Sequence, residues 1–351
     1  MTLDLVYSTT KGYSSLLPLY RFFKHAGWQV RLEKVHRNCF RNRQLLRTLS
    51  KHIVIAYDKP LIRLEKCGWQ GEFIYIEHGL SPMKYYTYKY EFFQRAALLF
   101  YPGEIFKRKM EAINPEFDRG LLGGYPKIDE LLDMDPDKAA LIEKFQLNPD
   151  KPIILFAPSW GGKRNPEAGI HNAKYLKELD NVIIVPHSAD YKLVKKYGAI
   201  KPGAGGISTF LHLADVVVSD VSSVLAEASI LDKPVVQLKL PHYPGCFPDV
   251  EKRTSGTWIS DEMLAREQTT DRAVRPFKIP YVDEDWIMGH TAGPAELEAA
   301  IMDALEKPQL FSAERKFWAK QSCYKADGKS SRRIADMIEH YLKTGTPQQI
   351  D

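Results

Sequence analysis

The sequence feature that most constrains the fold is a regular alternation of short apolar runs with longer helical patterns. The apolar runs are rich in β-branched residues and lie at residues 3–7, 52–56, 73–76, 97–101, 153–156, 182–185, 216–219 and 235–238. Strands that are apolar throughout are buried on both faces of a sheet. The alternation therefore predicts an α/β fold with parallel sheets covered by helices.

Helical periodicity is clearest at residues 15–26, 137–145, 171–179, 222–231 and 296–305. A polar, proline-containing stretch at residues 133–152 separates two series of strands and predicts a domain boundary. We expect an N-terminal domain over residues 1–135 and a C-terminal domain over residues 150–328. The C-terminal helix and tail, residues 329–351, follow the second domain, and the sequence leaves open whether they cross back to pack on the first. The whole predicts two Rossmann-like domains facing a cleft.

Composition limits the cellular setting. Hydrophobic residues make up 44% and charged residues 26%, as in folded globular proteins. No apolar run approaches the roughly 20 residues of a membrane span, and residues 1–7 read as a strand, not a signal peptide. We expect a cytoplasmic protein, soluble or peripheral on the inner face of the membrane. The net charge of +5 fits an anionic substrate or membrane, and equally an ordinary solvated surface.

The four cysteines, Cys39, Cys67, Cys246 and Cys323, are scattered and contain no CxxC pair. This spacing argues against a disulfide framework and against a structural zinc site. It also favours a reducing compartment.

The sharpest local motif is Ser219-Asp220-Val221-Ser222-Ser223, where a buried strand turns into a helix. Either Asp220 or Ser222 is suited to cap that helix. Free N–H groups, the helix dipole and two hydroxyls would together attract an anion. An ordinary capped helix explains the same residues equally well.

Two histidines follow predicted strands. His78 and Gly79 come after residues 73–76, and His187 comes after residues 182–185. Histidine can serve as a general base near neutral pH, and glycine allows a ligand to approach the backbone. A lone strand-end histidine is more often structural. If the two domains face each other, one histidine would act as base and the other would stabilise phosphate charge.

A third strand-end segment is Ser159-Trp160-Gly161-Gly162-Lys163-Arg164. Its small residues permit close approach, and Lys163 or Arg164 could contact phosphate. The segment lacks P-loop spacing, and no Gly-x-Gly-x-x-Gly follows the first strand, which argues against a dinucleotide oxidoreductase. The aromatic and basic residues at 84–95 suit a membrane surface, a stacked sugar or a packed helix. No motif supports nucleic-acid binding.

Taken in order, these motifs resemble the CDP-glycerol glycerophosphotransferase family of teichoic-acid and capsule biosynthesis. The similarity extends over residues 70–343 and includes residues 78–79, 124–129, 157–162, 186–187, 219–224, 231–234 and 327–333. It is the shared order and spacing, more than any single motif, that carries the resemblance.

The resemblance implies a glycosyltransferase-B-like enzyme that acts at the membrane surface without a catalytic metal or other cofactor. A hydroxyl of a lipid-linked or glycan acceptor would attack the β-phosphate of a CDP-activated donor, and CMP would leave. By the same resemblance, His78 is the base and His187 supports the transferring phosphate. The diphosphate would be held by Ser219, Asp220, Ser222, Ser223 and Arg332, with Asp220 mainly organising the turn. The resemblance also places the acceptor on the N-terminal domain and the nucleotide donor on the C-terminal domain. The cleft for donor and acceptor would be lined by Gly79, Ser159, Trp160, Gly161 and Lys163.

This sequence departs from the family pattern at four places. Where the family has a Thr-Trp-Arg-Gly-like element, this chain has Ser159-Trp160-Gly161-Gly162. Val221 replaces the usual tyrosine of the serine turn, and Ser188 replaces a proline. Residues 237–244 lack the aromatic, acidic character that is usual there. The short segment before the motifs favours single addition over polymerisation. The alternatives are a glycosyltransferase that uses a nucleotide-sugar in capsule or lipopolysaccharide assembly, and a silent binding module.

Overall fold

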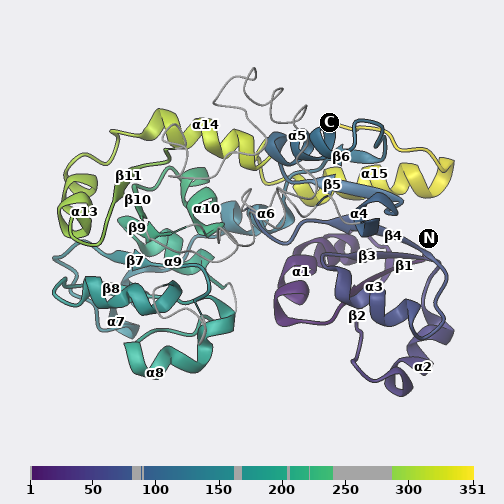
Figure 1. Ribbon diagram of the computed structural model, residues 1–351, viewed down its shortest axis with the longest axis horizontal. Helices are drawn as coiled ribbons and strands as arrows, with labels where there is room; N and C mark the ends of the chain where they lie inside the picture. The colour runs from purple at the N-terminus through teal and green to yellow at the C-terminus, as the bar shows by residue number, and fades with distance from the viewer. Residues whose placement is uncertain are drawn as a thin grey trace. The chain divides into compact units, whose positions relative to one another are not determined.

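The computed structural model describes residues 2–80, 88, 91–161, 168–203, 206–220, 222–239 and 287–351. These residues form two compact units (Figure 1). The first unit holds the described residues up to Leu80, those from 88 to Asp133 and those from Gln321 to the C-terminus. The second holds those from Met134 to Lys320.

The first unit is built on a six-stranded sheet with the order β2-β1-β3-β4-β5-β6, in which every pair is parallel. Its strands are β1 (Thr2–Tyr7), β2 (Gln29–Lys34), β3 (His52–Ile55), β4 (Glu72–Ile76), β5 (Leu98–Tyr101) and β6 (Gly120–Leu122). Its helices are α1 (Thr10–His25), α2 (Cys39–Thr48), α3 (Asp58–Glu65), α4 (Glu91–Gln94), α5 (Glu104–Ile113), α6 (Pro126–Asp133) and α15 (Ser330–Thr344).

One helix of the first unit comes from the far end of the chain. Ile334 and Ile338 of α15 are fully buried in one cluster with Leu16 and Leu19 of α1 and with apolar residues of the central strands. Burying one such side chain is worth about 1.5–3 kcal/mol. The apolar face of α15 therefore anchors the C-terminal segment to the first sheet.

The second unit has a five-stranded parallel sheet with the order β11-β10-β9-β7-β8. Its strands are β7 (Ile154–Phe156), β8 (Val182–Ile184), β9 (Val216–Ser219), β10 (Val235–Leu238) and β11 (His290–Ala292). Its α-helices are α7 (Lys138–Lys144), α8 (Val194–Tyr197), α9 (Ser208–Leu213), α10 (Val224–Ile230) and α13 (Leu297–Glu306), and α14 (Ser312–Ser322) continues into the first unit. Its described residues also form two 3-10 helices, η2 (Gly169–Leu176) and η3 (Ser188–Leu193).

All eight apolar runs that we predicted to be strands are strands in the structure. The three that the pattern missed, β2, β6 and β11, are all edge strands. An edge strand is partly solvated, so it does not need a continuous apolar run, and β2 reads Gln-Val-Arg-Leu-Glu-Lys. The α-helix expected at residues 171–179 is instead the 3-10 helix η2, which starts at Gly169 with a positive φ of 62°.

The cysteine spacing argued against a disulfide framework, yet two of the four cysteines form a disulfide. Cys39, the first residue of α2, forms a disulfide with Cys67, which follows α3, at a Cα separation of 5.8 Å. The packing of α2 against α3 brings the two together, and their separation of 28 residues in the sequence gives no sign of it. Cys323 is buried, and burial raises the pKa of its thiol to about 12. Cys246 lies outside the described residues.

None of the helices formed by the described residues has the length and apolar character required to cross a bilayer.

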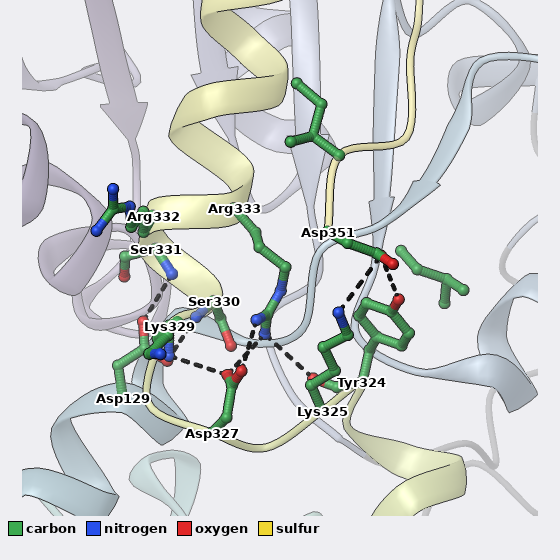
Figure 2. A network of polar contacts seen from close by, with 12 residues as sticks. Asp129, Tyr324, Lys325, Asp327, Lys329, Ser330, Ser331, Arg332, Arg333 and Asp351 are labelled. Carbon is green, nitrogen blue, oxygen red and sulfur yellow. Dashed lines mark hydrogen bonds and ion pairs between the residues drawn. The ribbon is translucent and has the colours of Figure 1, made fainter.

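The N-terminus of α15 is held by a carboxylate from α6 (Figure 2). The backbone N–H groups of Ser330 and Ser331 donate to Asp129 at 2.9 and 2.6 Å. Close by, Arg333 is 5% exposed and pairs with Asp327 at 2.9 Å. Gly124 has a φ of 80°, and a Cβ there would lie 2.4 Å from the Ser330 hydroxyl. Two segments of the resemblance, residues 124–129 and 327–333, therefore hold each other within the first unit.

Removal of this carboxylate should loosen the C-terminal helix. We expect Asp129→Ala to lower the free energy of unfolding by about 2–3 kcal/mol, because two N–H groups of a helix N-terminus lose their acceptor. Urea unfolding measures the loss, and limited proteolysis should release the C-terminal segment sooner. The control is Glu130→Gln, which removes a neighbouring exposed carboxylate that pairs with Arg21 at 2.5 Å. Equal stability of the two variants would contradict the capping role.

Candidate functional site

The loop that follows β7 is fixed by a buried carboxylate from the end of β9. The N–H of Ser159 donates to Asp220 Oδ1 at 2.7 Å, and the Ser159 hydroxyl donates to Oδ2 at 2.6 Å. Asp220 is 0% exposed. A buried carboxylate needs such donors because desolvation of its charge is costly. Asp220 therefore joins the ends of two neighbouring strands.

A second buried carboxylate holds the same loop from the other side. The N–H of Gly161 donates to Asp190 Oδ2 at 2.8 Å, and Asp190 is 1% exposed. Asp190 belongs to η3, just after β8, and β7 lies between β8 and β9 in the sheet. Asp190 was not among the site residues predicted from the sequence. The only signal was an aspartate three residues after a strand-end histidine.

Close backbone packing requires glycine at Gly161 in this loop and at Gly169, the first residue of η2. A Cβ at Gly161 would lie 2.0 Å from the carbonyl oxygen of Ala168, and one at Gly169 would lie 2.2 Å from the Gly161 nitrogen. Gly169 also has a φ of 62°, which side chains disfavour. We expected Gly161 to admit a ligand. In the structure, the close approach that it permits is to the chain's own backbone.

The serines of the turn after β9 fall into two groups. Ser219 is 0% exposed, and its hydroxyl donates to the carbonyl of Ala157 at 2.6 Å. Ser222 and Ser223 are only half-buried and stand at the start of α10. Ser223 directly precedes α10 but makes no side-chain cap bond, whereas the Ser222 hydroxyl accepts the N–H of Val224 at 3.4 Å. Asp220, the other predicted cap, accepts from Ser159 instead.

His187 stands at the N-cap of η3, and its ring orientation is set by the backbone. Its Nδ1 accepts a hydrogen bond from the N–H of Ala189 at 3.2 Å. In a neutral imidazole one nitrogen accepts and the other carries the proton. The contact therefore assigns the proton of neutral His187 to Nε2, which makes that atom a hydrogen-bond donor.

In the first unit, His78 follows β4 and lies against two groups that orient it. Its ring stacks on Tyr57 with 4.0 Å between centroids. Its Nδ1 lies 3.8 Å from Glu77 Oε2, an electrostatic approach longer than a hydrogen bond. Glu77 is 8% exposed and accepts hydroxyl hydrogens from Tyr88 at 2.7 Å and Tyr75 at 3.2 Å. Glu77 is a second site residue that the sequence analysis missed.

Burial raises the pKa of Glu77 above its ordinary value of 4.5, although the hydroxyls of Tyr88 and Tyr75 oppose the rise. A carboxyl with a raised pKa stabilises the fold fully below its unfolded value, and this contribution is lost as pH rises through the folded pKa. We therefore expect the stability of wild type relative to Glu77→Gln to fall as pH rises from 4.5 and then to level off. Urea unfolding across pH measures the difference, with the exposed Glu116→Gln as control. A flat difference would contradict the buried-carboxyl account.

The remaining predicted site residues lie as follows. Gly79 is half-buried, and Trp160 is 38% exposed at the end of the β7 loop. Arg332 is exposed on α15 and pairs with Asp336 at 3.9 Å. Lys163, Val221 and half of the aromatic and basic segment at 84–95 (residues 84–87, 89 and 90) lie outside the described residues. Within the described ranges, no three His, Cys, Asp or Glu side chains are grouped to hold a metal.

Two Rossmann-like units with polar groups gathered at the carboxyl ends of their strands make this a glycosyltransferase-B-like protein. The model of a family described as CDP-Glycerol:Poly(glycerophosphate) glycerophosphotransferase matches residues 23–240, and the chain belongs to this family. It is thus a transferase of the glycerophosphotransferase type. No curated protein matches it by sequence.

Solved structures share the fold. The wall teichoic acid polymerase TagF is 20% identical with a TM-score of 0.66, over 98% of this chain and 89% of that one. The S. aureus MnaA–UDP complex is 14% identical with a TM-score of 0.59, over 100% of both chains. A UDP-N-acetylglucosamine 2-epimerase is 15% identical with a TM-score of 0.58, over 100% of this chain and 99% of that one. At these identities the likeness concerns the fold.

Proposed function

We propose that the protein transfers glycerol phosphate, or a related alditol phosphate, from a CDP-activated donor to a lipid-linked or glycan acceptor in cell-surface polymer synthesis. The observation that carries the proposal is the loop after β7, which Asp190 and Asp220 hold close to the turn that carries the half-buried Ser222 and Ser223, in a chain of this family. Structures of the TagF polymerase, which include one with CDPG, support the donor class.

The reaction is a displacement at phosphorus. The acceptor oxygen forms a bond to the β-phosphorus of the donor while the bond to the oxygen that bridges the two phosphates breaks. CMP leaves with that bonding pair, and the acceptor proton passes to a base. Such a step needs a base for the hydroxyl and donors for the phosphate oxygens.

In the second unit we assign the diphosphate to Ser222 and Ser223, which are partly exposed before the first turn of α10. Ser219 and Asp220, which we had also expected to bind the diphosphate, act in this proposal as supports of the turn, because both are fully buried. The Nε2–H of His187 donates to a phosphate oxygen. Arg332 adds positive charge from an exposed position.

In the first unit we assign the base to His78. The buried carboxylate of Glu77 favours the imidazolium that forms when the ring takes the acceptor proton. Stacking on Tyr57 limits rotation of the ring. The predicted pairing of His78 with His187 across a cleft, and peripheral contact of the protein with the inner face of the membrane, remain predictions.

The test is product analysis with a panel of donors. The purified protein, with a lipid-linked or glycan acceptor, is incubated with labelled CDP-glycerol, CDP-ribitol and several nucleotide-sugars. We expect CMP and alditol phosphate transfer from a CDP-alditol, and no transfer from the sugars. Sugar transfer without alditol transfer would support the nucleotide-sugar glycosyltransferase instead. Binding of CDP-glycerol with no turnover on any acceptor would favour the silent binding module.

A further inference from the structure

One segment of the chain carries a net positive charge as large as that of the whole chain. Residues 34–52 contain six lysines and arginines and no acidic residue, a formal charge of +6, whereas the whole chain carries +5. All the other residues together therefore carry −1. The segment is therefore a local basic region in a chain whose other charges nearly balance.

The segment forms α2 and the turn before it, at the outer edge of the first unit beyond α3 (Figure 1). Within α2 itself, Asn42 is the only buried residue. Exposed on the segment are Arg37, Phe40, Arg41, Arg43 and Arg47, which we call the basic face. Phe40 is 70% exposed, and the Arg43 guanidinium lies 4.4 Å from the centre of its ring. In the part of the chain that the structure describes, none of the arginines of α2 pairs with a carboxylate.

The attachment of α2 leaves this face outward. The disulfide of Cys39 with Cys67 fixes its first turn, and the Asn42 side chain bonds the backbone of His36 at 2.9 and 3.0 Å. At its last turn, Arg31 bonds the Thr48 carbonyl at 2.5 Å and Asp4 at 2.7 Å. Most helices in proteins are stabilised by burial of an apolar face. Here polar and covalent contacts hold the helix, and its aromatic residue stays in solvent.

We infer that the basic face docks on a bilayer that contains anionic phospholipid. Arginines attract the negative headgroups, and each contributes about a fivefold gain in affinity near such a surface. An aromatic ring among them suits the boundary between headgroups and acyl chains. A free polyanion such as RNA would use the arginines but offers no apolar layer for Phe40. This docking brings the first unit to the surface where a lipid-linked acceptor would lie, and it does not rest on the proposed reaction.

The test is sedimentation with phosphatidylcholine vesicles that do or do not contain phosphatidylglycerol, with no donor or acceptor present. We expect binding that depends on phosphatidylglycerol, weakened about 100-fold by Arg41→Gln, Arg43→Gln and Arg47→Gln together, at about fivefold for each. Phe40→Ser alone should weaken it about tenfold. The control triple, Lys174→Gln, Lys177→Gln and Lys196→Gln, removes three exposed lysines of the second unit and should bind as wild type does.

Two outcomes would overturn the inference. One is equal vesicle binding by the arginine triple and the lysine triple. The other is wild-type vesicle binding by Phe40→Ser together with equally tight retention of RNA, which would make the face a general polyanion site. Thermal unfolding of each variant, followed by circular dichroism, checks that the substitutions at exposed positions leave the fold intact.

Discussion

Replacement of His78 with glutamine is expected to lower the rate of CMP release by about 10²–10⁴-fold, the usual contribution of a positioned general base. Glutamine keeps much of the size and hydrogen-bonding capacity of the ring but accepts no proton near neutral pH. The affinity for CDP-glycerol should change little, because our proposal places the donor on Ser222 and Ser223 of the second unit. Steady-state CMP release and calorimetric binding of CDP-glycerol measure the two quantities separately.

Two further variants make this experiment specific. His25→Gln removes an exposed histidine at the end of α1 and should leave the rate unchanged. Tyr57→Phe keeps the ring that stacks on His78 and should retain most of the activity. A His78→Gln protein that folds normally and releases CMP at the wild-type rate would exclude His78 as the base.

The sequence pattern predicted the central strands well because those strands are buried on both faces. The short, continuous apolar runs at 153–156 and 216–219 are typical of buried strands, and they form β7 and β9. Edge strands such as β2 carry mixed side chains, so their position depends on the sheet that they join. The disulfide is a similar case, since Cys39 and Cys67 meet only through the packing of α2 on α3.

The sequence predicted where the candidate site lies, but it did not predict the hydrogen bonds that hold the site together. Strand-end histidines and serines are visible in the sequence, because parallel sheets place their ligands at the carboxyl ends of the strands. The buried carboxylates behind them were not visible. In the sequence, Asp190 and Glu77 are indistinguishable from solvent-exposed polar loop residues, and only the folded structure shows that they are buried. Some family motifs, such as residues 124–129 and 231–234, also serve the fold itself: Asp232 of the second motif bonds the buried Arg315 at 2.8 Å.

The second large effect is expected at Asp220, which we treat as a positioning residue of the donor site. Asp220→Ala should weaken CDP-glycerol binding about 10–100-fold, because both donors of Ser159 would lose a buried acceptor, at roughly 1–3 kcal/mol for each unsatisfied group. The loop after β7 would then lose its link to the turn that carries Ser222. Asp220→Asn should recover part of the affinity, since its amide oxygen can still accept the Ser159 N–H.

The matched control is Asp215→Ala, which acts on the same pair of strands at their opposite ends. Asp215 accepts the N–H of Ile153 at 2.8 Å, just before β7, as Asp220 accepts that of Ser159 just after it. Both substitutions should lower the free energy of unfolding, but only Asp220→Ala should weaken donor binding beyond its effect on stability. A double-mutant cycle with Ser159→Ala isolates the coupling through the hydroxyl. Equal donor affinity of the Asp215 and Asp220 variants would show that the carboxylate supports the fold alone, and would remove the β7 loop from the donor site.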